Sequence, residues 1–131
     1  MEKEIIQQQE LLEFHPKTSF IIICKGRVVS IGFDEITHVS KYGGETVIYT
    51  KARSYRTYHS LQEILNDLPV NEFFRVHRSH ILSLQYMKGI RRNKIMVTQF
   101  YLPVTKHYKI QLCKKLAMII DRNYLFIIMD E

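Results

Sequence analysis

Residues 73–82 of the 131-residue chain read FFRVHRSHIL, the most informative stretch of the sequence. Its aromatic and β-branched residues are typical of β-strands, so we expect strand structure over residues 73–84. The apolar side chains should belong to the hydrophobic core rather than form platforms for stacked bases. These core candidates are Phe73, Phe74, Val76, Ile81 and Leu84.

Further strand-like runs lie on both sides of this stretch. They are found at residues 20–24, 28–33, 36–40, 46–50, 53–58, 95–97 and 100–104. The turn Lys25-Gly26-Arg27 and the pair Gly43-Gly44 predict hairpins between the first four runs, because glycine adopts the turn conformations that other residues avoid. Residues 88–94 are predicted to be a basic connection.

Two helices are also predicted. Ser60, with Glu63 three residues later, forms a capping box ahead of an apolar run, which places a short helix at about residues 60–68. Thr105 could cap a C-terminal helix at about residues 106–120. The apolar face of that helix would hold Tyr108, Leu112, Leu116, Ile119 and Ile120. The chain is therefore predicted to be a mainly β domain.

The positive charge of the chain is concentrated in one part of the sequence. The net charge is +6 at pH 7. Residues 73–120 hold ten Lys and Arg and no Asp or Glu, whereas residues 1–72 and 121–131 each carry a net charge of −2. A long stretch without carboxylates indicates a surface that meets an anionic partner.

Several protein classes are disfavoured by the same sequence. No apolar run approaches the 18 residues typical of a membrane span, and the N-terminus lacks the pattern of a secretory signal. Cys24 and Cys113 lie far apart in apolar surroundings, where small reduced core residues are expected. We therefore expect a cytoplasmic protein with no membrane partner.

Catalysis is not expected either. No glycine-rich phosphate loop, nucleophile elbow or metal-binding Cys/His array is found, and we expect no enzyme activity, cofactor or metal. His77 and His80 are the one tempting pair of metal ligands. On a strand, their separation of three residues would put the two rings on opposite faces, where a single metal ion could hardly bind both.

The residues of the basic stretch favour nucleic-acid binding over catalysis. Arg and Lys neutralise phosphates, and Arg, His and Ser also form hydrogen bonds with base edges. Two alternatives stay open at this point. One is an RNA-binding module, with exposed tyrosines as stacking platforms. The other is a protein-interaction domain whose basic surface meets an acidic partner.

The stretch at residues 73–82 resembles the signature of the LytTR DNA-binding domain family, F-x-R-x-H-[RN]-S followed by apolar residues. Residues 34–39 (DEITHV) are similar to an early strand element of that family, and residues 58–61 (YHSL) to the start of its short helix. Residues 100–108 (FYLPVTKHY) resemble its Leu-Pro-Val ending, with Thr105 where the family usually has Ser. The resemblance covers about residues 19–116.

The resemblance implies an elongated, mainly β fold of small stacked antiparallel sheets that is not a helix-turn-helix. Members of the family regulate bacterial transcription, usually at paired direct repeats, through loops that enter successive major grooves of double-stranded DNA. Two copies on such repeats would form a homodimer on DNA.

The resemblance also implies which residues bind DNA. The reading loops would be residues 41–46, the region of His77, Arg78 and Ser79, and the turn at Thr105, Lys106 and His107. Arg78 is the expected base contact, because Arg paired with guanine is the commonest specific contact, whereas His77 would either contact a phosphate or orient its neighbours. Thr46 is a further candidate in the first loop, and the DNA backbone would be contacted by Lys41, Arg91, Arg92, Lys106 and Lys109.

The resemblance predicts three parts of the chain: a lead-in or linker at residues 1–18, the DNA-binding domain at residues 19–120 and an extension at residues 121–131. Many members carry a receiver domain before the DNA-binding part, which makes this chain response regulator-like without such a domain. The chain is then a stand-alone member or a fragment, and an upstream sensor or kinase is left open. Residues 124–129 (YLFIIM) could add a strand to the sheet or mediate self-association.

Overall fold

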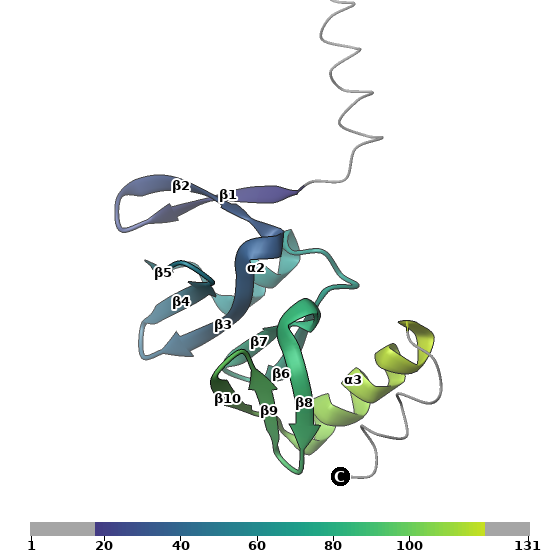
Figure 1. Ribbon diagram of the computed structural model, residues 1–131. Coiled ribbons are helices and arrows are strands. Elements are labelled where there is room, and N and C mark those ends of the chain that lie inside the picture. Colours follow the sequence, from purple (N-terminus) through teal and green to yellow (C-terminus); the bar gives the residue numbers. More distant parts are fainter. Residues whose placement is uncertain (1–17, 120–131) are drawn as a thin grey trace, which may run out of the picture.

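The computed structural model describes residues 18–119, which form three small antiparallel sheets and two α-helices (Figure 1). The N-terminal sheet pairs β1 (Ser19–Cys24) with β2 (Arg27–Gly32). The central sheet has the strand order β5-β4-β3-β7-β6. Its strands are β3 (Ile36–Tyr42), β4 (Glu45–Thr50), β5 (Ser54–Thr57), β6 (Phe73–His77) and β7 (His80–Ser83). The third sheet has the order β10-β9-β8, from β8 (Met87–Arg91), β9 (Lys94–Val97) and β10 (Phe100–Pro103).

Each face of the central sheet packs against a different layer, and β6 and β7 contribute side chains to both cores. Phe73 and Phe74 are neighbours on β6 and point to opposite faces, as successive residues of a strand do. On β7, Ile81 and Leu82 divide between the two faces in the same way. The predicted core residues of the stretch at 73–84 are confirmed, although Leu84 is only half-buried.

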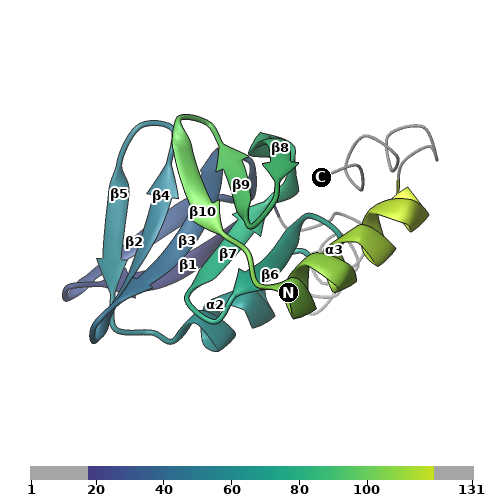
Figure 2. The same cartoon turned by 90° about the horizontal axis from the view of Figure 1, so that it is seen from below.

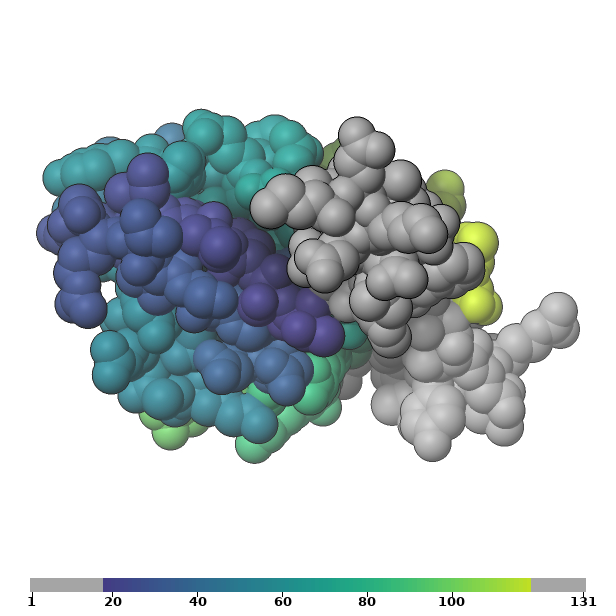
Figure 3. All heavy atoms as spheres, turned by 90° about the horizontal axis from the view of Figure 1, so that it is seen from above, coloured from purple at the N-terminus to yellow at the C-terminus, as the bar shows by residue number. Residues whose placement is uncertain are grey.

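One core lies between the central sheet, the β1–β2 hairpin and α2 (Leu61–Asp67). The other lies between the central sheet, the β8–β10 sheet and α3 (Lys106–Ile119). Figure 1 shows these layers stacked along the molecule, with the hairpin at the top and α3 at the bottom. From above, the purple and blue spheres of the hairpin run across the described part of the molecule, with teal spheres of later residues visible on either side (Figure 3). The mainly β fold of stacked sheets is confirmed.

The predicted capping box of the first helix is present. The Ser60 hydroxyl accepts a hydrogen bond from the Glu63 N–H at 3.1 Å, and the Glu63 carboxylate accepts one from the Ser60 N–H at 3.3 Å. In α3, Leu112 and Leu116 are buried as expected. The side chain of Ile119 and all of Ile120 lie outside the described residues.

Two short turns join the remaining elements: the 3-10 helices at Phe33–Glu35 and Leu84–Tyr86. Neither α2 nor α3, the α-helices of the described chain, is long and apolar enough to cross a membrane.

One strand was missed by the sequence analysis. The basic connection predicted at residues 88–94 is wrong, because β8 occupies Met87–Arg91 and pairs with β9. Ile90 is the one fully buried side chain of β8, and the strand lies at the edge of its sheet. An edge strand tolerates exposed charges, so the apolar pattern that identifies buried strands is absent here.

Candidate nucleic-acid interface

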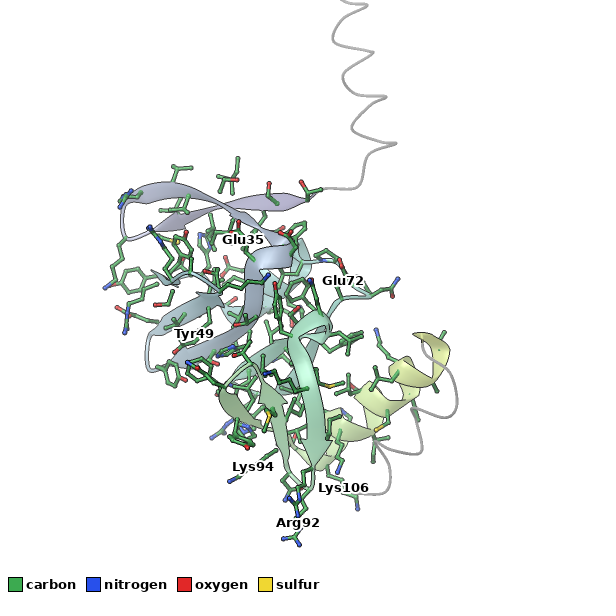
Figure 4. All side chains as sticks on the ribbon, viewed as in Figure 1. Glu35, Tyr49, Glu72, Arg92, Lys94 and Lys106 are labelled. Carbon is green, nitrogen blue, oxygen red and sulfur yellow. The ribbon has the colours of Figure 1, made fainter. Side chains whose placement is uncertain are left out.

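Most of the predicted DNA-binding residues lie at strand ends and in turns at one end of the molecule. We call this surface the basic edge. It consists of Lys41, His77, Arg78, Ser79, Arg91, Arg92, Thr105, Lys106, His107 and Lys109. In Figure 4, Arg92 and Lys106 lie together at the bottom, and the acidic residues Glu35 and Glu72 lie far above them.

Hydrogen bonds connect the turns of the basic edge in space. The Lys41 N–H donates to the Ser79 carbonyl at 2.9 Å, because β3 and β7 are paired next to the β6–β7 turn. The Thr105 N–H donates to the Val76 carbonyl at 3.1 Å, which fixes the start of α3 against β6. The Lys109 ammonium donates to the Arg92 carbonyl at 2.7 Å. Segments far apart in the sequence thus form one surface.

Among the described residues, the cations of the basic edge form no identified ion pair with a carboxylate. The identified ion pairs of residues 18–119 join Glu45 to Lys25 and Arg56, and Glu63 to His59. The sequence from residue 73 to residue 119 contains no Asp or Glu, and the side chains of Arg78, Arg91, Arg92, Lys94 and Lys106 are exposed. Such a surface attracts phosphate groups.

The β6–β7 turn is held in shape by a residue that the sequence analysis did not select. The Arg75 guanidinium donates from Nε to the His77 carbonyl at 3.1 Å and from Nη2 to the Arg78 carbonyl at 2.5 Å. The Ser79 N–H donates to His77 Nδ1 at 3.0 Å. In the neutral ring the proton therefore sits on Nε2, which leaves that nitrogen as a donor. Arg75 is a positioning residue for the exposed Arg78.

The change Arg75→Lys tests this role. Lysine keeps the charge, but it lacks the planar guanidinium that donates to two carbonyls at once. We therefore expect the free energy of opening the turn to fall by about 1 kcal/mol. The Ser79 amide should then exchange its hydrogen roughly fivefold faster, as measured by NMR. Arg27→Lys in the β1–β2 turn is the matched control, and it should leave Ser79 unchanged. Equal exchange in both variants would show that Arg75 does not brace the turn.

The expected positions of His77 and His80 are wrong. The residues lie on different strands and pair directly across the β6–β7 hairpin, with ring centroids 5.2 Å apart. The reason is that the chain reverses at residues 78–79, so the two rings share a face. No group of three or more His, Cys, Asp or Glu that could hold a metal ion occurs among residues 18–119.

A polar layer lies behind this turn. His80 Nδ1 is 2.6 Å from the Ser40 hydroxyl, and His38 Nδ1 is 2.9 Å from the Thr37 hydroxyl. The His38 ring stacks on Tyr49 with centroids 4.3 Å apart. Burial, helped by nearby His80, lowers the pKa of His38 to about 4. Burial, helped by nearby His77, lowers the pKa of His80 to about 4. Both rings are therefore neutral at pH 7.

The structure changes the predicted set of DNA-binding residues at two positions: Thr46 is buried, and Lys94 is an additional exposed cation. Thr46 is only 2% exposed, because its side chain is covered in the central sheet between Lys41 and Thr57. Its hydroxyl is not presented at the basic edge. Lys94 was not selected, yet it is exposed and pairs across the β8–β9 turn with Arg91. Figure 4 shows it near Arg92.

Comparison with known proteins identifies the fold and the family. The family model for the LytTr DNA-binding domain matches residues 26–117. The chain belongs to the LytTR DNA-binding domain family. A solved LytTr DNA-binding domain, from a putative methyl-accepting/DNA response regulator of Bacillus cereus, has the same fold with a TM-score of 0.65. It is 20% identical, and the match covers 77% of this chain and 98% of that domain.

Two curated relatives are transcription or signalling proteins. The transcriptional regulatory protein NatR of Bacillus subtilis is 39% identical over 54 residues, which are 41% of this chain and 23% of NatR. The sensory transduction protein LytR of Staphylococcus haemolyticus is 31% identical over 85 residues, 65% of this chain and 33% of LytR. The LytTR match thus spans about a quarter to a third of the length of these relatives.

Proposed function

We propose that this LytTR domain binds double-stranded DNA sequence-specifically through the basic edge and acts in bacterial transcription regulation. The observation that carries the proposal is the hydrogen-bonded contact between the β6–β7 turn, the end of β3 and the start of α3, all with exposed basic side chains. Phosphates need cations along a continuous surface, and base edges need donors that project from it.

Different side chains of the basic edge are proposed to contact the bases and the phosphates of the DNA. Arg78 projects from a braced turn and is the proposed base contact, since its two amino groups match the acceptors of guanine. The Nε2–H of His77 is placed to donate to a phosphate. The remaining basic side chains would contact the DNA backbone: Lys41, Arg91, Arg92, Lys94, Lys106 and Lys109. Thr105, His107 and Ser79 supply further polar contacts, whereas buried Thr46 is left out of the proposed interface.

Direct repeats are the proposed target, with one copy of the chain on each repeat and the turns in successive major grooves. Selection of bound duplexes from a random pool tests this arrangement. We expect a preferred pair of repeats separated by about one or two helical turns. Enrichment of a single isolated site would contradict the paired arrangement but not DNA binding itself.

The salt dependence of DNA affinity tests the electrostatic part of the proposal. If about five phosphates are neutralised, log K should fall against log salt with a slope of roughly −4 to −5 on duplex DNA. Lys106→Ala should reduce the magnitude of the slope by about 1. Lys51→Ala is the control, because Lys51 lies next to Glu35 and away from the basic edge. A flat salt dependence would contradict the proposal.

Binding of single-stranded RNA is the second candidate, because Tyr42 and Tyr101 are 54% and 61% exposed and could stack on bases. Competition between duplex DNA and single-stranded RNA separates the two functions. We expect duplex DNA to displace the RNA. If neither duplex DNA nor RNA binds at physiological salt, the result would instead favour a protein-interaction domain whose basic surface meets an acidic partner.

A further inference from the structure

A groove of about 350 Å³ lies between α2, β6 and α3. Its apolar lining includes Leu65, Phe73, Phe74 and Leu112. Val70 also lines it and is 70% exposed. Figure 2 shows α2 and the first turns of α3 on either side of β6. A concave apolar surface of this kind suits an apolar segment.

The charged residues of the groove are both positive. Arg75 and Lys115 line it, and no carboxylate is among its lining residues. The Lys115 ammonium lies 5.5 Å from the centre of the Phe74 ring, so its charge sits directly above the apolar lining. Arg75 uses Nε and Nη2 to brace the β6–β7 turn, and its Nη1 makes no identified hydrogen bond among residues 18–119. The groove therefore favours an occupant that is apolar with acidic residues beside it.

The chain itself contains such a segment. Residues 124–131, which lie outside the described residues, read YLFIIMDE: six apolar or aromatic residues followed by Asp130 and Glu131. Helix α3 is described to Ile119, four residues beyond Lys115 and thus roughly 6 Å along the helix axis. The four residues between Ile119 and Tyr124 can span up to about 13 Å. The segment is thus tethered within reach of the groove.

We propose that residues 124–131 dock in the groove between α2, β6 and α3. The apolar side chains cover the lining that includes Phe73 and Phe74, and the acidic pair meets Lys115 and Arg75. Because Arg75 also holds the β6–β7 turn, the docked segment is linked to the DNA-binding turn through one guanidinium. The docking does not depend on the proposed DNA-binding function, and it is measured without DNA.

A single tryptophan reports on the docking, because the natural chain contains none. In the full chain carrying Phe126→Trp, we expect blue-shifted emission and several-fold weaker acrylamide quenching than in the same chain unfolded in urea. Adding Val70→Asp places a charge in the groove and should shift the emission to the red with several-fold stronger quenching. Val70 is exposed, so this change should leave the fold intact, which circular dichroism checks.

Val28→Asp is the matched control, because Val28 is 73% exposed on the β1–β2 hairpin near exposed Ile21 and Ile23. We expect it to leave the emission unchanged. If Val28→Asp releases the tryptophan and Val70→Asp does not, the segment covers the hairpin instead, and the proposal is wrong. Emission that depends on protein concentration would show self-association and would also overturn it, as would a fully exposed tryptophan.

An exchange of charges tests the acidic end of the segment. Lys115→Glu alone, and Asp130→Lys together with Glu131→Lys, should each increase the quenching several-fold in the Phe126→Trp chain. Combining them restores opposite charges and should return the quenching toward the value of the Phe126→Trp chain. Additive loss in the combined variant would show that the acidic pair does not meet Lys115.

Discussion

Arg78→Ala should weaken binding to the preferred duplex by about 5- to 150-fold, which corresponds to roughly 1–3 kcal/mol. Arg78 is exposed at the tip of the β6–β7 hairpin, and its backbone carbonyl is held by Arg75. A guanidinium in a fixed position can donate two hydrogen bonds to one guanine, and alanine can donate none. The loss should be largest for the preferred sequence and small for unrelated duplexes, as measured by fluorescence anisotropy with both.

Arg27→Ala is the matched control for this experiment. Arg27 is also an exposed arginine beside a tight hairpin turn, but it belongs to the β1–β2 hairpin, a different sheet from that of Arg78, and lies outside the basic edge. We expect Arg27→Ala to change the affinity for either duplex by no more than about twofold, since a single charge outside the contact surface adds little at physiological salt. If Arg78→Ala instead weakens all duplexes equally, Arg78 contacts a phosphate and does not read bases.

Acidification should destabilise the fold by several kcal/mol between about pH 6.5 and pH 4. The pKa values of His38 and His80 are both lowered to about 4 in the folded chain, whereas an unfolded histidine has a pKa of about 6.5. Between these values the unfolded state binds more protons, so the free energy of unfolding falls as the pH falls. The full contribution is present above about pH 6.5 and is lost as the pH approaches 4. The buried His38 ring contributes up to about 3 kcal/mol, and the half-buried His80 ring contributes less because solvent screens its charge.

His38→Phe tests the source of this dependence. Phenylalanine keeps an aromatic ring against Tyr49 and Phe100 but takes up no proton, so the slope of unfolding free energy against pH should become shallower. Urea unfolding at a series of pH values measures the slope. Phe100→Leu is the control, because it disturbs the same cluster without removing a titrating group and should lower stability equally at all pH values. An unchanged slope in His38→Phe would exclude His38 as the cause.

Turn chemistry explains which parts of the fold could be predicted from the sequence. The β1–β2 and β3–β4 hairpins were predicted because Gly26 and Gly43 mark their turns, and both adopt positive φ angles of 80° and 60°. The β6–β7 turn contains no glycine, so the reversal at residues 78–79 was missed. At the β8–β9 turn, Arg92 adopts a positive φ of 55°. Arginine rarely adopts this conformation, so its presence in the sequence does not predict a turn.

The site could be predicted as a set of loops but not as a set of side chains. The resemblance selected the turns that the structure brings together, because short motifs mark them. The role of Arg75 depends on where its guanidinium points, and the burial of Thr46 depends on the pairing of β4 with β3 and β5. Neither follows from local sequence, since both are set by contacts between segments that lie on different strands.

If the basic edge binds DNA, the duplex should lie against its turns and not against the β1–β2 hairpin. In an NMR titration of the full chain with the preferred duplex, the largest shifts of amide resonances should fall at Lys41, at residues 77–79, at residues 91–94 and at residues 105–109. The β1–β2 hairpin at residues 19–32 should shift little. Shifts that concentrate in that hairpin, with the turns of the basic edge unchanged, would show that DNA binds elsewhere on the domain.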